Sequence, residues 1–157
     1  MKDITLVIPA KNESESLPKV LIELSNYDIK KIVVIPPDDI KTRDSIKDFD
    51  CKILPQKGIG FGNALIQGIS QVETKYFCIF NADGSFNPKY LEKLIDKLNS
   101  NIDFVFCSRY EDGGGSDDDT ILTYVGNKFF TTFCNLLFNL NLTDVLFTYV
   151  MGSTKAF

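Results

Sequence analysis

The 157-residue sequence contains no histidine and no closely spaced pair of cysteines. Without histidine, the chain lacks the usual general base at neutral pH and the base of a Ser-His or Cys-His pair. The four cysteines occur singly, at Cys51, Cys78, Cys107 and Cys134, so a zinc site is not expected. We expect reduced, structural thiols, with Cys78 and Cys107 inside apolar strands. Acid–base chemistry would fall to carboxylates, lysine, tyrosine or the substrate.

A surplus of basic residues and a membrane-spanning run are also absent. The net charge of −4 argues against a nucleic-acid-binding surface, which is normally basic. The longest uncharged stretch, Phe129 to Thr143, contains three Asn and three Thr and is too short and polar to cross a bilayer. The N-terminus leads directly into a predicted strand, so no signal peptide is expected. These features predict a cytosolic protein and leave contact with a membrane surface open.

Hydrophobic residues make up 44% of the chain, and the length fits one α/β domain with its own core. Apolar runs typical of strands alternate with segments of helical spacing. We predict strands at Ile4–Ile8, Ile32–Ile35, Lys52–Leu54, Tyr76–Phe80, Ile102–Cys107 and Val145–Val150. We predict helices from Leu17 to Leu24, within 38–48, over Asn63–Val72, from Pro88, and over Thr120–Leu140. This alternation predicts a mainly parallel sheet covered by helices on both faces.

Polar residues follow the first predicted strand, in the segment Pro9-Ala10-Lys11-Asn12-Glu13. The loop after the first strand of such a sheet forms one wall of the ligand crevice. Asn12 and Glu13 are therefore candidates for hydrogen bonds to a base or ribose, with the Pro9 turn fixing the backbone. The alternative is a helix cap at Asn12 with Glu13 in the first helical turn.

A glycine-rich segment, Lys57 to Ala64, joins the third predicted strand to a helix. Glycines there let backbone N–H groups approach phosphate or ribose oxygens, and a helix N-terminus favours anions. The spacing matches neither a P-loop nor a dinucleotide-binding fingerprint. An ordinary turn into a helix is the alternative.

The segment Asn81-Ala82-Asp83-Gly84-Ser85 ends the fourth predicted strand and is the most informative part of the chain. A carboxylate at this end of an α/β strand lies where open sheets bind ligands. Asn81, Asp83 and Ser85 offer the oxygen ligands that a hard divalent cation on a diphosphate needs. A turn built on Asp83 and Gly84 is the alternative.

Ser108-Arg109-Tyr110 follows the fifth predicted strand. We expect Arg109 on the same side of the sheet as Asp83, where a guanidinium would suit a phosphate. A surface arginine paired with Glu111 or Asp112 is the alternative. The loop from Gly113 to Asp119 is predicted to be either a lid over the site or a solvated acidic loop.

Together these segments resemble the family 2 glycosyltransferases of GT-A fold, especially the branch of dolichol- and polyprenyl-phosphate sugar synthases. The resemblance covers nearly the whole chain, because five blocks occur in the right order. They are Ile8 to Glu13, Lys57 to Ala64, Asn81 to Ser85, Ser108 to Tyr110 with Gly113 to Gly115, and Gly126-Asn127 through Thr143-Asp144.

The resemblance implies a GT-A, Rossmann-like fold, a nucleoside-diphosphate sugar donor and an Mg²⁺ or Mn²⁺ ion. It implies that Asp83 binds the metal with help from Asn81 and Ser85, and that Arg109 holds a phosphate. The residues expected near the nucleotide are Pro9, Ala10, Asn12, Glu13, Asp38, Lys57, Gly60, Asn63, Asn81 and Ala82. A lipid-phosphate acceptor would already be anionic and would need no strong base, which suits a chain without histidine.

The sequence departs from the family in three places. Asn81 stands where the family usually has an aspartate, so the metal would be held more weakly or differently. After the second strand, Asp38 and Asp39 follow two prolines and lie about two residues later than the family's acids, and Asp38 is the candidate for base or ribose recognition. The chain ends at Phe157, where many relatives continue, which fits either a shortened chain or a minimal enzyme.

Two features near the end of the chain have alternative interpretations. Asp144 is either a catalytic or acceptor-orienting carboxylate or a cap on the last strand. The apolar segment Phe129 to Leu142 is predicted to be core, whereas exposed phenylalanines there would favour membrane contact instead.

A metal-dependent glycosyltransferase is the leading hypothesis. A nucleotidyltransferase is a second class, although the glycine- and lysine-rich first loop expected there is missing. A catalytically degenerate nucleotide-binding subunit is a third, motivated by Asn81 and the shifted acids. The sugar, the base, the acceptor and the oligomeric state are not set by the sequence.

Overall fold

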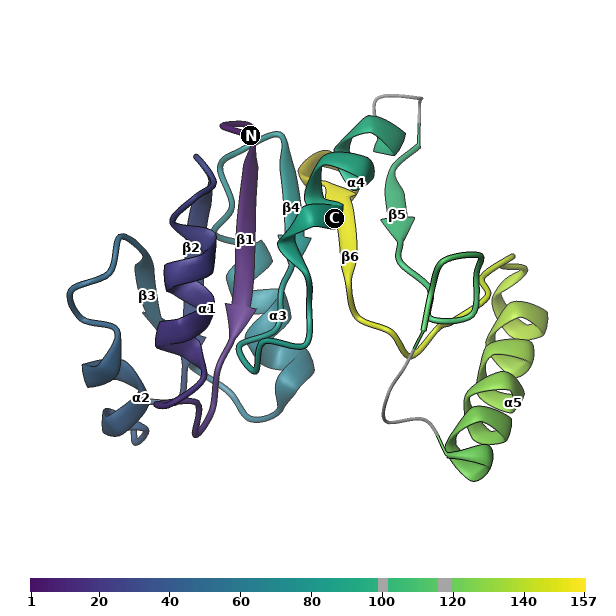
Figure 1. Cartoon of the computed structure of the whole chain (residues 1–157), viewed down its shortest axis with the longest axis horizontal. Coiled ribbons are helices and arrows are strands. Elements are labelled where there is room, and N and C mark those ends of the chain that lie inside the picture. Colours follow the sequence, from purple (N-terminus) through teal and green to yellow (C-terminus); the bar gives the residue numbers. More distant parts are fainter. Residues whose placement is uncertain (99–101, 116–119) are drawn as a thin grey trace. The chain divides into compact units, whose positions relative to one another are not determined.

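The structure is a computed structural model that describes residues 1–98, 102–115 and 120–157 (Figure 1). It divides into two compact units, one formed by Met1–Val105 with Met151–Phe157 and the other by Phe106–Val150. The acidic end of the predicted loop from Gly113 to Asp119 lies outside the described residues. That the two units act as one glycosyltransferase domain stays a prediction.

A six-stranded sheet, in the order β3-β2-β1-β4-β6-β5, forms the centre of the first unit (Figure 1). Its strands are β1 (Ile4–Pro9), β2 (Lys30–Ile35), β3 (Lys52–Pro55), β4 (Tyr76–Ile79), β5 (Phe104–Phe106) and β6 (Val150–Ser153). Strand β1 pairs in parallel with β2 and β4, and β2 pairs in parallel with β3. Strand β6 is antiparallel to β4. The predicted mainly parallel sheet is confirmed.

Helices connect the strands in the predicted alternation. They are α1 (Leu17–Leu24), α2 (Ile40–Ser45), α3 (Phe61–Ile69), the 3₁₀ turn η1 (Pro88–Tyr90), α4 (Leu91–Leu98), α5 (Ile121–Phe138) and the 3₁₀ turn η2 (Thr154–Ala156). Figure 1 shows α1 and α3 on opposite faces of the sheet, as right-handed crossovers in opposite directions require. Helix α3 lies so close to the sheet that a Cβ at Gly68 would come within 2.4 Å of Val7 Cγ1.

The core of the first unit lies on both faces of β1. Its inner strands are fully buried because they are β-branched and apolar on both faces, as parallel strands under helices must be. Val7 packs with Val34, Ala64, Ile69 and Phe77 on the α3 side. Each such side chain contributes about 1.5–3 kcal/mol on burial.

Two predicted features of the last strands need correction. The strand predicted over Val145–Val150 is wrong, because β6 begins only at Val150 and the residues before it form a loop. The ladder with β4 starts at the pair Met151 and Cys78, so pairing and not local apolar pattern sets the position of β6. Cys78 is buried in β4, whereas Cys107 follows β5 and is only partly buried.

Candidate nucleotide and metal site

The carboxyl ends of β1, β2 and β4 lie at one edge of the sheet because these three neighbouring strands are parallel. Most of the predicted site residues follow these ends. They are Pro9 as the last residue of β1, Ala10, Asn12 and Glu13 after it, Asp38 after β2, and Asn81, Ala82, Asp83 and Ser85 after β4. The sheet therefore brings three separate polar segments to the edge where open α/β sheets bind ligands.

The turn after β4 presents Asp83 to solvent. The Ser85 backbone N–H donates to Asp83 Oδ1 over 2.9 Å, and Asn81 Nδ2 donates to Ser85 Oγ over 3.0 Å. Gly84 has φ +84°, a left-handed conformation that favours glycine. Asp83 is exposed while Ala82 is buried, so the carboxylate points away from the core. This turn, the predicted alternative, is compatible with metal binding because it leaves Asp83 Oδ2 and Asn81 Oδ1 without a hydrogen bond from any described residue.

An Mg²⁺ or Mn²⁺ ion suits the oxygen atoms at this turn. Asp83 offers a carboxylate and Asn81 an amide carbonyl, the hard ligands that these cations take. Among the described residues, no three or more carboxylate or thiol side chains gather as a metal cage. A cation at this turn would therefore need substrate phosphates and water to complete its coordination.

The loop after β1 is not a helix cap. Asn12 adopts a left-handed conformation with φ +61°, and α1 begins only at Leu17, after Ser16. The alternative of a cap at Asn12 is therefore wrong. The Glu13 carboxylate accepts a short hydrogen bond from Ser16 Oγ, and the Ala10 N–H donates to the Val34 carbonyl over 2.9 Å. The first contact closes the loop on itself, and the second fixes it beside the end of β2.

The two acids after β2 differ sharply in their contacts. Asp38 is exposed, and its carboxylate makes no hydrogen bond or ion pair with a described residue. Asp39 caps α2, where its Oδ1 accepts the Thr42 N–H over 3.2 Å, and its Oδ2 accepts the Asn12 N–H over 2.6 Å. The sequence indicated Asp38 as the candidate for base or ribose recognition, and it gave no role to Asp39 or Thr42. The spacing Asp-x-x-Thr at a helix start was the available signal.

The glycine-rich loop before α3 is held by its own side chains and by Gln67. The Gly58 N–H donates to Asn63 Oδ1 over 3.1 Å, and the Lys57 N–H donates to Gln67 Oε1 over 2.8 Å. Gly60 has φ +94° and its carbonyl accepts from Gln56 Nε2 over 2.9 Å. These contacts fix the conformation of the loop. Nucleotide binding by Lys57, Gly60 and Asn63 stays a prediction.

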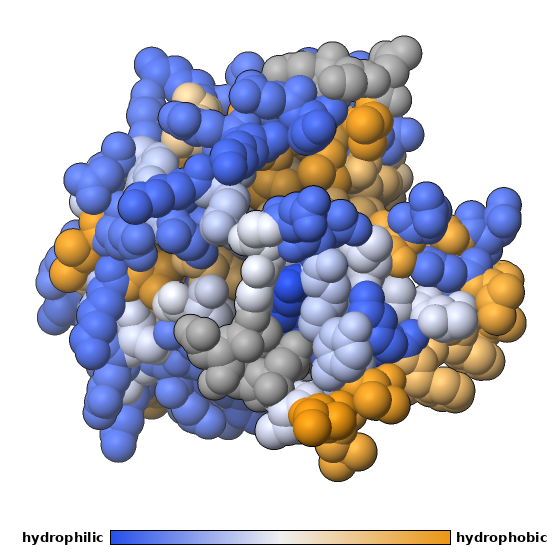
Figure 2. All heavy atoms as spheres, turned by 45° about the vertical axis from the view of Figure 1, so that its right-hand side comes forward, coloured by the Kyte–Doolittle hydropathy of each residue, from blue (hydrophilic) through white to orange (hydrophobic). Residues whose placement is uncertain are grey.

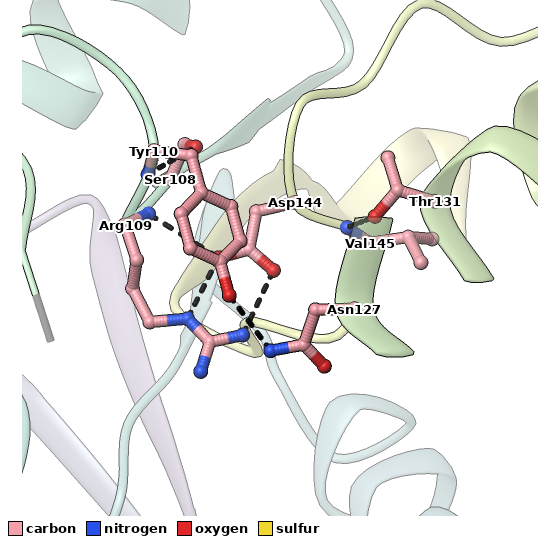
Figure 3. A network of polar contacts seen from close by, with 7 residues as sticks. All are labelled: Ser108, Arg109, Tyr110, Asn127, Thr131, Asp144 and Val145. Atoms are coloured by element: carbon pink, nitrogen blue, oxygen red, sulfur yellow. Dashed lines mark hydrogen bonds and ion pairs between the residues drawn. The ribbon is translucent and has the colours of Figure 1, made fainter. Parts of the chain in front are cut away.

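In the second unit, Arg109 and Asp144 form a bidentate ion pair (Figure 3). Arg109 Nε donates to Asp144 Oδ2 over 2.7 Å, and Nη2 donates to Oδ1 over 3.0 Å. Burial disfavours the Asp144 charge, but the hydrogen bonds and positive charge of Arg109 outweigh it and hold the pKa of Asp144 below its usual range. The partner of Arg109 is thus Asp144 and not Glu111 or Asp112, and Asp144 is not a cap on β6.

Aromatic rings flank this ion pair. The Arg109 guanidinium lies 5.3 Å from the ring centre of Tyr110 and 5.4 Å from that of Phe147. Asn127 Nδ2 donates to Tyr110 Oη over 2.8 Å, and Lys128 Nζ lies 4.6 Å from the centre of the same ring (Figure 3 shows the Asn127 contact). The pair, the rings and α5 are therefore one packed cluster.

Helix α5 is exposed over most of its surface, so the prediction of a core segment at Phe129 to Leu142 is wrong. Phe129, Phe130, Phe133 and Phe138 are between 51% and 69% exposed. Thr131 is the one buried residue of α5, where its Oγ1 accepts the Val145 N–H over 3.2 Å. Figure 2 shows hydrophobic side chains gathered on this surface. No helix in the described part of the chain is long and apolar enough to cross a membrane.

The fold is that of the GT-A glycosyltransferases, as solved structures show. The structure superposes on glucosyl-3-phosphoglycerate synthase from Mycobacterium tuberculosis, solved with Mn²⁺, UDP and glucosyl-3-phosphoglycerate, with a TM-score of 0.75 at 17% identity, over 97% of this chain and 57% of that one. Mannosyl-3-phosphoglycerate synthase from Rubrobacter xylanophilus gives a TM-score of 0.68 at 15% identity, over 98% of this chain and 54% of that one.

The chain belongs to glycosyl transferase family 2, whose pattern matches residues 5–157. It is 26% identical to a dolichol-phosphate mannosyltransferase from Pyrococcus furiosus over 120 residues, which cover 71% of this chain and 34% of that protein. It is 22% identical to glycosyltransferase AglJ from Haloferax volcanii over 156 residues, which cover 98% of this chain and 51% of that protein. The chain thus matches at most about half the length of these relatives. The predicted resemblance is confirmed.

Proposed function

We propose that the chain forms the donor-binding part of a glycosyltransferase that moves a sugar from a nucleoside-diphosphate sugar to an acceptor. The observation that carries the proposal is the exposed Asp83 carboxylate at the end of β4, beside the loops that follow β1 and β2. Membership of glycosyl transferase family 2 supports the same reaction class. Solved structures of the same fold contain UDP with Mn²⁺ or Mg²⁺, which supports a nucleotide and a divalent cation here.

In the proposed mechanism, Asp83, Asn81 and Ser85 would hold an Mg²⁺ or Mn²⁺ ion, and that ion would offset negative charge on the departing diphosphate. Asn12, Glu13 and Asp38 bind the base and ribose. Arg109 would hold a phosphate group, while Asp144 fixes the plane of its guanidinium. Asp144 is therefore proposed as a positioning residue and not as a base.

We propose a polyprenyl phosphate at a membrane surface as the acceptor. The exposed apolar side chains of α5 support contact with lipid, because gathered exposed apolar residues mark interaction surfaces, membranes among them. Lys128 is the one charged residue of α5, so contact of this helix with lipid would desolvate few charges. The resemblance to a dolichol-phosphate mannosyltransferase points to the same acceptor class.

A thermal-shift series tests the donor proposal. UDP, GDP, CDP and TDP are each added with Mn²⁺ to the wild-type chain, to Asp83→Ala and to the exposed control Asp96→Ala. At a hundredfold excess over Kd, one nucleotide should raise the Tm of wild type and Asp96→Ala by about 5–10 °C and leave Asp83→Ala unchanged. No shift with any of the four nucleotides would contradict the proposal.

A second candidate is a degenerate nucleotide-binding subunit. Asn81 and the shifted acids Asp38 and Asp39 favour it, because one usual carboxylate is replaced and two lie about two residues later than in the family. Nucleotide binding without hydrolysis of a sugar donor or transfer from it would support this candidate over an enzyme.

A further inference from the structure

Two hydrogen bonds tie the loop after β1 to the start of α2, and a third lies within the start of α2 itself. The Asn12 N–H donates to Asp39 Oδ2 over 2.6 Å, and the Glu13 N–H donates to Thr42 Oγ1 over 2.9 Å. The Thr42 N–H donates to the other Asp39 oxygen over 3.2 Å. Two consecutive backbone amides of the first loop are thus held by two side chains of the second. We call Asp39 and Thr42 the loop clamp.

The clamp goes beyond the needs of a helix cap. Capping α2 uses one Asp39 oxygen, whereas the second oxygen and the Thr42 hydroxyl both reach another segment, 27 and 29 residues away in sequence. Thr42 is fully buried, so its hydroxyl cannot exchange this contact for one with water. Asn12 has a left-handed backbone, a conformation that asparagine adopts more readily than most non-glycine residues and that orients its N–H toward Asp39.

The charge of Asp39 strengthens the clamp. Partial burial disfavours that charge, but the Asn12 N–H, the Thr42 hydroxyl and the Thr42 N–H outweigh it, and they lower the pKa of Asp39 with some help from Lys11. Hydrogen bonds to an ionised carboxylate are stronger than neutral ones. Both Asp39 oxygens accept backbone N–H groups, which leaves the exposed Asp38 as the acid free to meet a ligand.

We infer that Asp39 and Thr42 are positioning residues for nucleoside recognition, holding Asn12 and Glu13 in the conformation that meets the base and ribose. This inference rests on the proposed function, because it assigns the clamp to the same nucleotide site. The Asp83 turn follows a different strand, so the clamp acts on the nucleoside half of the donor and not on the metal and diphosphate half.

Conservative variants separate the clamp from the cap. Asp39→Asn keeps an oxygen that caps α2, since Asn is as good a cap as Asp, but it loses the charge and sets an N–H₂ group against the Asn12 N–H. Thr42→Val removes the hydroxyl that accepts from the Glu13 N–H and also contacts Asp39, and Thr42→Ser restores it. Asp44→Asn changes an exposed acid on the same helix and is the matched control.

Equilibrium binding at 15 °C, well below unfolding, compares each nucleoside diphosphate with inorganic pyrophosphate, both with Mn²⁺. For the nucleotide that wild type binds, Asp39→Asn and Thr42→Val should weaken binding about tenfold, as expected for the loss of a buried or charged hydrogen bond. Thr42→Ser and Asp44→Asn should bind as wild type does. Pyrophosphate affinity should be equal in all five proteins, because pyrophosphate has no nucleoside.

The outcomes are distinct. If wild type binds a nucleotide and both clamp variants bind it equally well, the inference is wrong and the proposed function stands. If wild type binds no nucleotide, the proposed function fails and the inference fails with it. Equal losses for nucleotide and pyrophosphate also overturn the inference, since they indicate general damage to the fold. If Asp39→Asn does not fold, the comparison of Thr42→Val with Thr42→Ser decides.

Discussion

Arg109 and Asp144, 35 positions apart, are joined by three hydrogen bonds that close the second unit of the chain. Besides the two bonds from the guanidinium, the Arg109 backbone N–H donates to Asp144 Oδ2 over 3.2 Å. The Asp144 side chain is fully buried and that of Arg109 is 19% exposed. The pair therefore links the segment after β5 to the segment after α5 in a place that water hardly reaches.

Removing the cation of this pair should destabilise the fold strongly. Arg109→Met leaves the buried Asp144 carboxylate without a counter-charge, which costs about 3–5 kcal/mol. Arg109→Lys should recover only part of this loss, because an ammonium cannot make the parallel pair of bonds. Urea unfolding measures both changes against Asp112→Asn, an exposed acid in the same unit. A loss for Arg109→Met within about 0.5 kcal/mol of that control would contradict the expectation.

The same pair should make stability depend on pH in acid. Because the folded pKa of Asp144 is lowered, its contribution is fully present above the unfolded pKa of about 4 and is lost as the pH falls through the folded value. The Tm of wild type should therefore fall more steeply below about pH 4 than that of Asp144→Asn. Asp39 acts with the same sign, so Asp39→Asn with Asp144→Asn should give the flattest profile. Parallel profiles in all variants would argue against both lowered pKa values.

Exposed phenylalanines on α5 should bind lipid vesicles. Phe129 and Phe133 stack with ring centres 6.4 Å apart on the exposed surface of the helix. Changing both to serine removes apolar area worth about 1.5–3 kcal/mol per ring, so vesicle binding should fall more than tenfold. Cosedimentation with vesicles of neutral and anionic lipid measures this, with the exposed ring of Tyr90 changed to serine as control. Absence of wild-type binding, or equal binding by the double variant, would refute the membrane proposal.

The sequence predicted most of the helices and strands, because their formation depends mainly on the spacing of neighbouring side chains. The β-branched runs at Ile4–Pro9 and Lys30–Ile35 and the buried stripe of α1 follow directly from side-chain spacing. The start of β6 did not follow, since it depends on pairing with β4, more than 70 residues earlier. The exposure of α5 was not predicted. A helix with apolar residues all around it predicts burial, and the pattern does not show what would cover the helix.

The sequence predicted which loops form the candidate site, but it did not predict which side chains in those loops form contacts within the protein. Asp83 could be placed at a strand end from the sequence, and the structure leaves it exposed there. Asp38 and Asp39 are adjacent and chemically identical. The residue at which α2 begins determines which of the two carboxylates accepts hydrogen bonds from backbone amides, and here it is Asp39. The sequence could not predict the partner of Arg109 either. Glu111 and Asp112 are much nearer to it in sequence, but the ion pair forms with Asp144.

The central claim is that Asp83 holds a divalent cation against a nucleoside diphosphate, and isothermal titration tests it most directly. The nucleotide that shifts the Tm is titrated with and without Mn²⁺ into wild type, Asp83→Ala and Asn81→Asp. The account predicts Mn²⁺-dependent binding in wild type, none in Asp83→Ala, and tighter binding in Asn81→Asp, because a second carboxylate joins the metal ligands. Equal nucleotide affinity in all three proteins, with or without Mn²⁺, would contradict it.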